Sequence, residues 1–227
     1  MIPSDSTGTF QWDNQGKFWY LRGSFQHDPF NKEADAKRNF DNELKKADAL
    51  NKLGLLNGVG KNENGSIDYD IERTPTRLEA LVMLIRLLGK DEDAKTGNWV
   101  CPFDDVPDWG KAYVSYAYEN GLTNGISDTK FGVGDATAKM YLTFALRALG
   151  YDDGADKDFS WDAPEALAQK CGILSGDINT SDFTRGDLVT ISYYMLRAPH
   201  KEDGRPLYEH LIDQGVFTRE QYDLYME

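Results

Sequence analysis

The sequence has few of the features that mark an enzyme, a metalloprotein or a disulfide-rich protein. Cys101 and Cys171 are its only cysteines, and they lack the short spacing of a metal-ligand pair. The histidines at positions 27, 200 and 210 are scattered, with no serine or cysteine nucleophile motif near them. We therefore expect no catalytic residue, no metal and no cofactor. The two cysteines could pair, but their spacing favours free thiols.

Long hydrophobic runs are also missing. No stretch approaches the roughly 20 apolar residues that span a membrane. Residues 1–4, Met-Ile-Pro-Ser, have neither the basic nor the apolar segment of a signal peptide. Either the protein is cytoplasmic, or it is a mature piece from which an export signal has been removed.

Positive charge is scarce as well. The 38 acidic residues outnumber the 25 lysines and arginines, which leaves a formal net charge of -13. Such a surface argues against nucleic acid and anionic membranes as main partners. A negatively charged ligand would need a local cluster of cations. The apolar content of 40% is enough to build a hydrophobic core.

What the sequence does contain is one motif written three times. Each copy has Gly-[Leu/Ile]-x-x-Gly, a polar loop, and a threonine that opens an amphipathic helix. Such a repeat indicates units that bury their apolar faces by packing on one another. The three copies begin at Gly54, Gly121 and Gly172, and their threonines are Thr76, Thr137 and Thr184.

The helices after these threonines share one register. Apolar side chains recur 5, 9 and 12 positions after each threonine, which is one face of a helix. They are Leu81, Ile85 and Leu88, then Leu142, Leu146 and Leu149, then Val189, Tyr193 and Leu196.

The chain is therefore predicted to be mainly α, with three tandem helix-loop-helix repeats in a pseudo-threefold bundle. The predicted divisions are an N-terminal β-hairpin extension at 1–30, repeats at 31–92, 99–152 and 157–198, and a C-terminal helical extension at 199–227.

The N-terminal extension differs from the repeats. Two aromatic strand-like runs, at 9–12 and 18–21, flank a turn of composition Asp-Asn-Gln-Gly, which predicts a β-hairpin. Its Trp12, Trp19 and Tyr20 could stack on sugars, but packing against the helical body is the more common fate of such side chains. A long helix is predicted over 31–53.

The motif Thr76-Arg77-Leu78-Glu79 begins the second helix of repeat one. Threonine and glutamate at this spacing form a capping box, which explains both without a ligand. Arg77 is not explained, because a cation at the positive end of a helix is mildly unfavourable. An arginine beside a helix N-terminus can bind a carboxylate or phosphate, or can pair with the many acidic side chains. The third copy has the same arrangement, because Arg185 directly follows Thr184 and precedes the capping residue Asp187.

These motifs resemble the S-layer homology domain. The resemblance rests on the Phe-x-Asp-Val-Pro-x-Trp pattern of 103–109, the glycine pairs, and Thr-Arg-x-Glu. It implies a triplet of helical hairpins over about 35–198, whose inter-repeat grooves hold an acidic secondary cell-wall polysaccharide. The implied binding residues are Arg77 and Arg185, the aromatic residues Trp109 and Trp161, and the loop glycines Gly58, Gly125 and Gly176.

Repeat two departs from the pattern, because Ala138 and Met140 replace the arginine and the acidic residue. Lys139 is a partial substitute without bidentate geometry. We expect a non-catalytic anchor at the surface of a Gram-positive-type bacterium, bound to acidic wall polysaccharide. A scaffold that binds a surface protein is the alternative, and an enzyme ranks last.

Overall fold

A computed structural model describes residues 9–12, 18–21, 32–154 and 157–226, with side chains from residue 39 onward. The chain divides into two compact units, residues 1–39 and residues 40–227. The predicted repeats lie in the second unit, apart from the first residues of repeat one, because α1 begins at Lys32.

The first unit contains the predicted hairpin. Strands β1 (Thr9–Trp12) and β2 (Phe18–Leu21) pair antiparallel, with Thr9 opposite Leu21 and Trp12 opposite Phe18. The turn between them and the side chains of the hairpin lie outside the described residues. Stacking of its aromatic side chains on sugars therefore stays a prediction.

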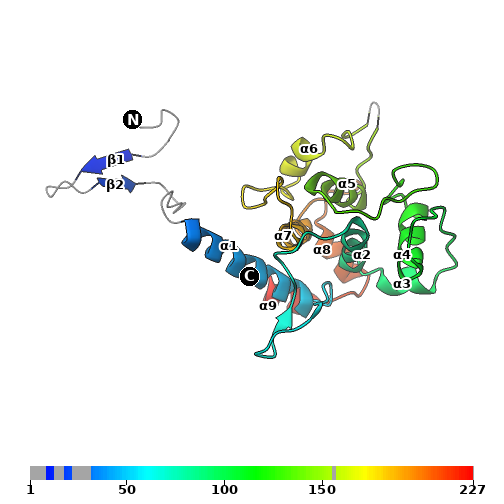
Figure 1. Cartoon of the computed structure of the whole chain (residues 1–227), viewed down its shortest axis with the longest axis horizontal. Helices are drawn as coiled ribbons and strands as arrows, with labels where there is room; N and C mark the ends of the chain where they lie inside the picture. Colours follow the sequence, from blue (N-terminus) through cyan, green and yellow to red (C-terminus); the bar gives the residue numbers. More distant parts are fainter. Residues whose placement is uncertain (1–8, 13–17, 22–31, 155–156, 227) are drawn as a thin grey trace. The chain divides into compact units, whose positions relative to one another are not determined.

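The chain is mainly helical, as predicted (Figure 1). The repeats contain α1 (Lys32–Lys52), α2 (Arg77–Leu87), α4 (Asp108–Glu119), α5 (Ala138–Ala148), α6 (Glu165–Lys170) and α7 (Arg185–Met195). Two short helices follow, α8 (Leu207–Asp213) and α9 (Arg219–Tyr225). Two further features are not predicted from the sequence, helix α3 (Asp91–Thr96) and the small antiparallel pair of β3 (Gly60–Lys61) and β4 (Ile67–Asp68).

The second helices of the three repeats share one hydrophobic core. Helix α2 contacts α5, α5 contacts α7, and α2 contacts α7 (Figure 1). Seven of the nine side chains in the predicted register are buried, while Leu88 and Tyr193 are half-buried against the same core. None of the three apolar faces could be covered by its own repeat alone.

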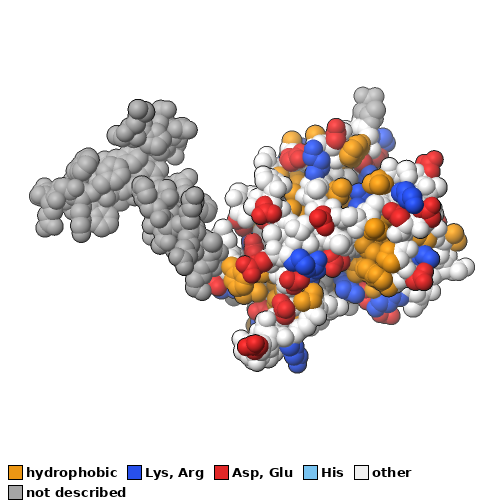
Figure 2. Space-filling model, viewed as in Figure 1, with side chains coloured by type: hydrophobic (Ala, Val, Ile, Leu, Met, Phe, Trp, Pro, Cys, Tyr) orange, Lys and Arg blue, Asp and Glu red, His pale blue; other side chains and the backbone are white. Residues whose placement is uncertain are grey.

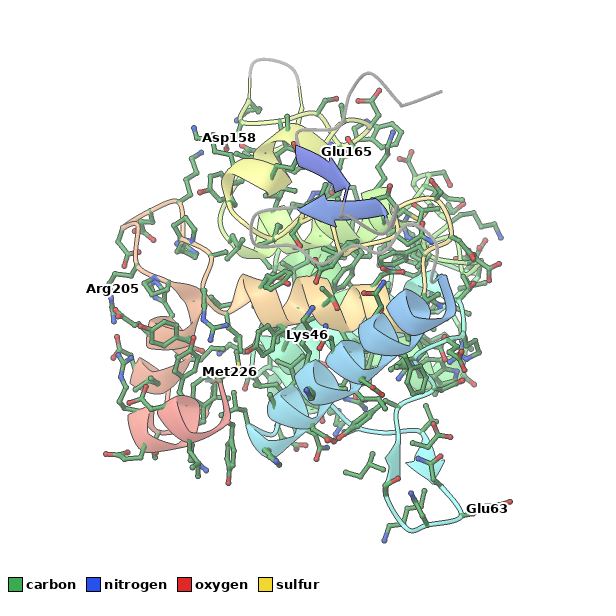
Figure 3. The ribbon with its side chains drawn as sticks, turned by 90° about the vertical axis from the view of Figure 1, so that its left-hand side faces the viewer. Lys46, Glu63, Asp158, Glu165, Arg205 and Met226 are labelled. Atoms are coloured by element: carbon green, nitrogen blue, oxygen red, sulfur yellow. The ribbon has the colours of Figure 1, made fainter. Side chains whose placement is uncertain are left out.

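Each second helix also touches the first helix of another repeat. Leu78 of α2 lies so close to Gly110 of α4 that a Cβ there would approach its Cδ2 to 2.6 Å. Thr143 of α5 donates to the carbonyl of Trp161, just before α6. Gly186 of α7 lies against Glu43 of α1, and Figure 3 shows α1 and α7 side by side. The second helix of repeat one thus contacts repeat two, that of repeat two contacts repeat three, and that of repeat three contacts repeat one. The pseudo-threefold arrangement stays a prediction, and these contacts support it.

The first helices end in the same way. At each end a glycine with positive φ follows the helix, and the next amide donates to the carbonyl five residues earlier. This geometry is the Schellman motif, which closes the helix and turns the chain. The bonds run from Leu55 to Leu50, from Leu122 to Ala117 and from Ile173 to Ala168.

The surface of the second unit is mixed in charge. Figure 2 shows acidic and basic side chains interspersed on one face, with a group of hydrophobic side chains near α2 and α4. Cys101 and Cys171 are free thiols. Among the described residues, none of the helices has both the length and the apolar character needed to cross a bilayer.

Two glycines of repeat two give a matched test of this packing. Gly121 and Gly125 have φ of +70° and +71°, so alanine should cost about 1 kcal/mol at either position. A Cβ at Gly121 meets open space, whereas one at Gly125 would collide with the Phe103 ring and the Lys130 carbonyl. Gly125→Ala should therefore cost a further ~1–3 kcal/mol in urea denaturation. Equal losses for the two variants would contradict the described packing.

Candidate functional site

The start of α2 is held by hydrogen bonds within its own first turn and by one hydrogen bond to repeat two. Thr76 Oγ1 accepts from the Glu79 amide at 3.2 Å, and Glu79 Oε2 accepts from the Thr76 amide at 2.8 Å, which forms a capping box. The Arg77 amide donates to the Gly134 carbonyl at 2.8 Å. The backbone thus places Arg77 where repeats one and two meet, which we call the Arg77 seam.

The glutamate of this capping box is strongly held. Arg73 donates to both oxygens of Glu79, at 2.9 and 3.0 Å. Burial opposes ionisation of Glu79, but the hydrogen bonds from Arg73 and Thr76 outweigh it and lower its pKa to about 2. Because it is already paired, Glu79 does not neutralise Arg77.

The guanidinium of Arg77 is buried between two aromatic rings. Its Cζ lies 5.0 Å from the ring centre of Phe131 and 5.2 Å from that of Phe144, and the residue is 8% exposed. Its Nε has no hydrogen-bond partner, and no described carboxylate lies within the 4.0 Å of an ion pair. Burial and the nearby Arg147 lower its pKa to about 10, with Asp105 opposing them. Arg77 is thus a buried cation without a matching anion.

Arg185 occupies the corresponding place at the start of α7, but the chain itself satisfies it. It is 5% exposed, its Nε donates to the Tyr69 carbonyl at 3.0 Å, and its Nη1 lies 3.3 Å from the sulfur of Met83. Burial lowers its pKa, and Arg73 adds to this effect. These contacts give Arg185 a structural explanation that Arg77 lacks.

The capping box of α7 is also present, with Asp187 accepting from the Thr184 amide at 3.0 Å. A further carboxylate, that of Glu43, lies against Gly186 in the first turn of α7, where any Cβ would collide with it. Burial and the nearby Asp187 raise the pKa of Glu43 to about 7, although Lys46 opposes them. The seam between repeats three and one is therefore already rich in carboxylates.

Repeat two keeps the cap and lacks the cation. Thr137 accepts from the Met140 amide at 3.3 Å, Ala138 is buried, and Lys139 is exposed. Among the described residues Lys139 has no ion pair. The arginine of this repeat is Arg147, ten residues after the threonine, where it forms a partly buried ion pair with Asp153 at 2.6 Å.

The two tryptophans are exposed beside the seams. Trp109, in the first turn of α4, is 59% exposed, and Trp161, before α6, is 63% exposed. Trp109 precedes Gly110, which packs on α2, and the carbonyl of Trp161 contacts α5. Large exposed aromatic faces of this kind are available for stacking on a ligand.

The loop glycines differ from one another. A Cβ at Gly58 would collide with Ile67, and one at Gly125 with Phe103, so both are explained by close approach of the chain to itself. Gly176 has open space around it. A role for these glycines in admitting a ligand stays a prediction.

Sequence reasoning missed Phe131 and Phe144, which flank Arg77, and it did not anticipate that both motif arginines are buried. The signal in the sequence was weak, because Phe131 lies in a loop and Phe144 belongs to an ordinary apolar helix. It also treated His200 and His210 as scattered, whereas their ring centres lie 5.0 Å apart.

Comparison with known protein families gives a match that includes part of the Arg77 seam. Residues 102–137, which contain α4 and end at the cap of α5, match the family model of the S-layer homology domain. The resemblance to that family is confirmed in this segment.

Two curated relatives are also similar to this chain. The middle cell wall protein of Brevibacillus brevis is 30% identical over 146 residues, which are 61% of this chain and 13% of that protein. The surface layer protein of Brevibacillus choshinensis is 31% identical over 106 residues, which are 45% of this chain and 9% of that protein. The chain thus spans a small part of the length of each relative.

The raised pKa of Glu43 predicts a pH dependence of stability. A carboxyl group whose pKa is about 7 when folded and 4.5 when unfolded binds more protons in the folded state. The stability that the folded state gains by binding this proton is therefore lost as pH rises from 4.5 to 7. Glu43→Gln should stabilise the protein by about 1–2 kcal/mol at pH 8, allowing for solvent screening, and by little below pH 4.5.

Thermal unfolding of the variant and the parent at several pH values measures this difference. Glu63→Gln, at the tip of the β3–β4 loop (Figure 3), is the control and should leave the pH profile unchanged. A Glu43→Gln profile parallel to that of the parent would contradict the assignment.

Proposed function

We propose that this chain is a non-catalytic module that anchors a protein to the cell wall by binding an acidic polysaccharide at the Arg77 seam. The domain match at 102–137 and relatives named as cell wall and surface layer proteins support a wall-binding role. On this proposal the protein acts at the cell surface, after removal of an export signal.

The single observation that carries the proposal is the buried guanidinium of Arg77, whose Nε has no hydrogen-bond partner and which has no ion pair among the described residues. A buried charge without a partner is costly, and a ligand carboxylate can offset that cost with a charge-assisted hydrogen bond. The adjacent start of α2 adds the positive end of an eleven-residue helix. A carboxylate-bearing sugar therefore fits this seam better than a neutral one.

The residues around Arg77 take different parts in the proposal. Trp109 offers its exposed ring to a sugar face beside the seam, and Lys139 offers a solvent-facing cation at the start of α5. Trp161 would serve the next seam in the same way. Arg185, already bonded to the chain and near Glu43, contributes less.

An acidic protein that binds an acidic polymer must rely on local charge. The net charge of -13 repels a polyanion at long range, and salt screens that repulsion beyond about 8–10 Å. Binding should then strengthen with moderate salt until the contact with Arg77 is itself screened.

The second candidate is a scaffold that binds a surface protein and ignores wall polysaccharide. It is favoured by the loss of the arginine in repeat two and by exposed apolar side chains in the loop before α5. These include Ile126 at 64% and Val133 at 39% exposure.

The test replaces the charge and keeps the packing. Arg77→Met should reduce retention on purified wall material by ~10–100-fold, because a charge-assisted hydrogen bond of about 1.5–3 kcal/mol is lost. The same substitution should leave the melting temperature unchanged or higher, because it removes a buried unpaired charge. Co-sedimentation with wall sacculi measures retention, and thermal unfolding measures stability.

Lys139→Met and Arg185→Met are the matched controls, and both should reduce retention less than Arg77→Met. Sacculi from which the polysaccharide has been chemically removed should bind none of the proteins. Equal retention of Arg77→Met and the parent would reject the proposal. Retention that survives removal of the polysaccharide would favour the protein-binding scaffold.

A further inference from the structure

The two described histidines meet in the C-terminal extension. His200 lies in the loop between α7 and α8, which also contains Asp203, and His210 lies on α8. Arg205, labelled in Figure 3, marks the same loop. No part of the proposed polysaccharide site involves these residues.

Three ligand atoms of suitable kind converge there. One atom each from His200, Asp203 and His210 lies within 4.8 Å of the others. His210 Nε2 is 3.2 Å from Asp203 Oδ1. Ligand atoms around a tetrahedral Zn²⁺ are about 3.3 Å apart, given metal–ligand distances near 2.0 Å. Side-chain shifts of up to about 1.5 Å would bring the ligand atoms to this spacing.

The backbone holds the loop in place. The His200 amide donates to the Arg205 carbonyl at 2.8 Å, and the Gly204 amide donates to the His200 carbonyl at 2.8 Å. The Lys201 amide donates to Leu149, in repeat two, at 2.9 Å. The loop therefore presents its ligands from a fixed turn, which lowers the entropy that ion binding must overcome.

Charge at the cluster favours a cation. Asp203 Oδ1 accepts from the Arg205 amide at 3.0 Å, which fixes the carboxylate beside His210. The guanidinium of Arg205 is held elsewhere, by Glu209 at 3.1 Å and Asp213 at 2.7 Å. Arg205 therefore does not compete with an ion for the carboxylate of Asp203.

Space for a further ligand lies beside the histidines. Both line a cavity of about 260 Å³, whose other walls include Arg147, Asn120 and Gln214. Gly150 faces the His200 ring, where a Cβ would come within 3.3 Å of Nε2. A larger residue at position 150 would crowd this ring, whose Nδ1 accepts a hydrogen bond from the Glu202 amide at 3.4 Å.

We propose that His200, Asp203 and His210 bind a divalent transition-metal ion, Zn²⁺ by ligand preference, with a water from the cavity as fourth ligand. Two imidazoles and one carboxylate suit Zn²⁺, whereas Ca²⁺ and Mg²⁺ prefer oxygen ligands alone. The ion would fasten the loop that follows α7 to α8 within the C-terminal extension.

The test uses the whole chain, freed of metal by EDTA and titrated with Zn²⁺ by calorimetry at neutral pH. We expect one ion per chain and a rise in melting temperature of ~5–10 °C at a hundredfold excess over Kd. His200→Gln and His210→Gln should each weaken binding at least ~10-fold, and Asp203→Asn should weaken it as well. Melting of each variant in EDTA shows whether it is folded.

His27→Gln is the control, since it removes the remaining histidine of the chain and should leave affinity unchanged. Co²⁺ in place of Zn²⁺ should give visible bands of tetrahedral nitrogen and oxygen ligation. Thiolate charge-transfer bands would instead assign the ion to Cys101 or Cys171 and overturn the proposal. Absence of binding, or affinity unaffected by both His200→Gln and His210→Gln, would overturn it equally.

Discussion

The packing of α2, α5 and α7 on one another is the constraint on which the rest of the structure depends. Each of these helices presents an apolar face that its own repeat cannot cover, and burial of that face is the main gain in folding. Because the three helices must converge, their N-termini meet neighbouring repeats. The main chain then joins them there, as where the Arg77 amide donates to Gly134 and the Arg185 amide donates to Arg73.

This arrangement gives two arginines of one motif different roles. Arg185 donates to a carbonyl and lies against a methionine sulfur, so its burial is compensated within the chain. Arg77 is enclosed by Phe131 and Phe144, whose ring faces attract a cation but do not replace an anion. Burial of a charge without an anion among the described residues costs stability, and ionisable groups perturbed by burial cluster at functional sites. The other two repeats also differ in charge. Repeat two has Ala138 in place of the arginine, and Glu43 lies where repeats three and one meet.

Much of the fold could be predicted from the sequence, because helical periodicity and capping are local. The shared register, the threonine caps and the glycines after the first helices each depend on a few neighbouring residues. The site could be predicted only in part. The motif indicated where Arg77 begins its helix, but not that Phe131, from a loop more than fifty positions away, would cover it. Helix α3 was missed because its six residues have no apolar face to give a period.

The sequence alone therefore determined most of the helices, the threonine caps, the register shared by α2, α5 and α7 and the resemblance to the S-layer homology domain, since these depend on residue spacing along the chain. Only the tertiary structure decided which charges are compensated. It buried Arg185 with hydrogen-bond partners and Arg77 between two aromatic rings with no described anion, and it set Glu43 against α7. It also brought His200 and His210 together from opposite sides of a turn. Burial and long-range contacts set the free energy of a charge, and neither is encoded in local spacing.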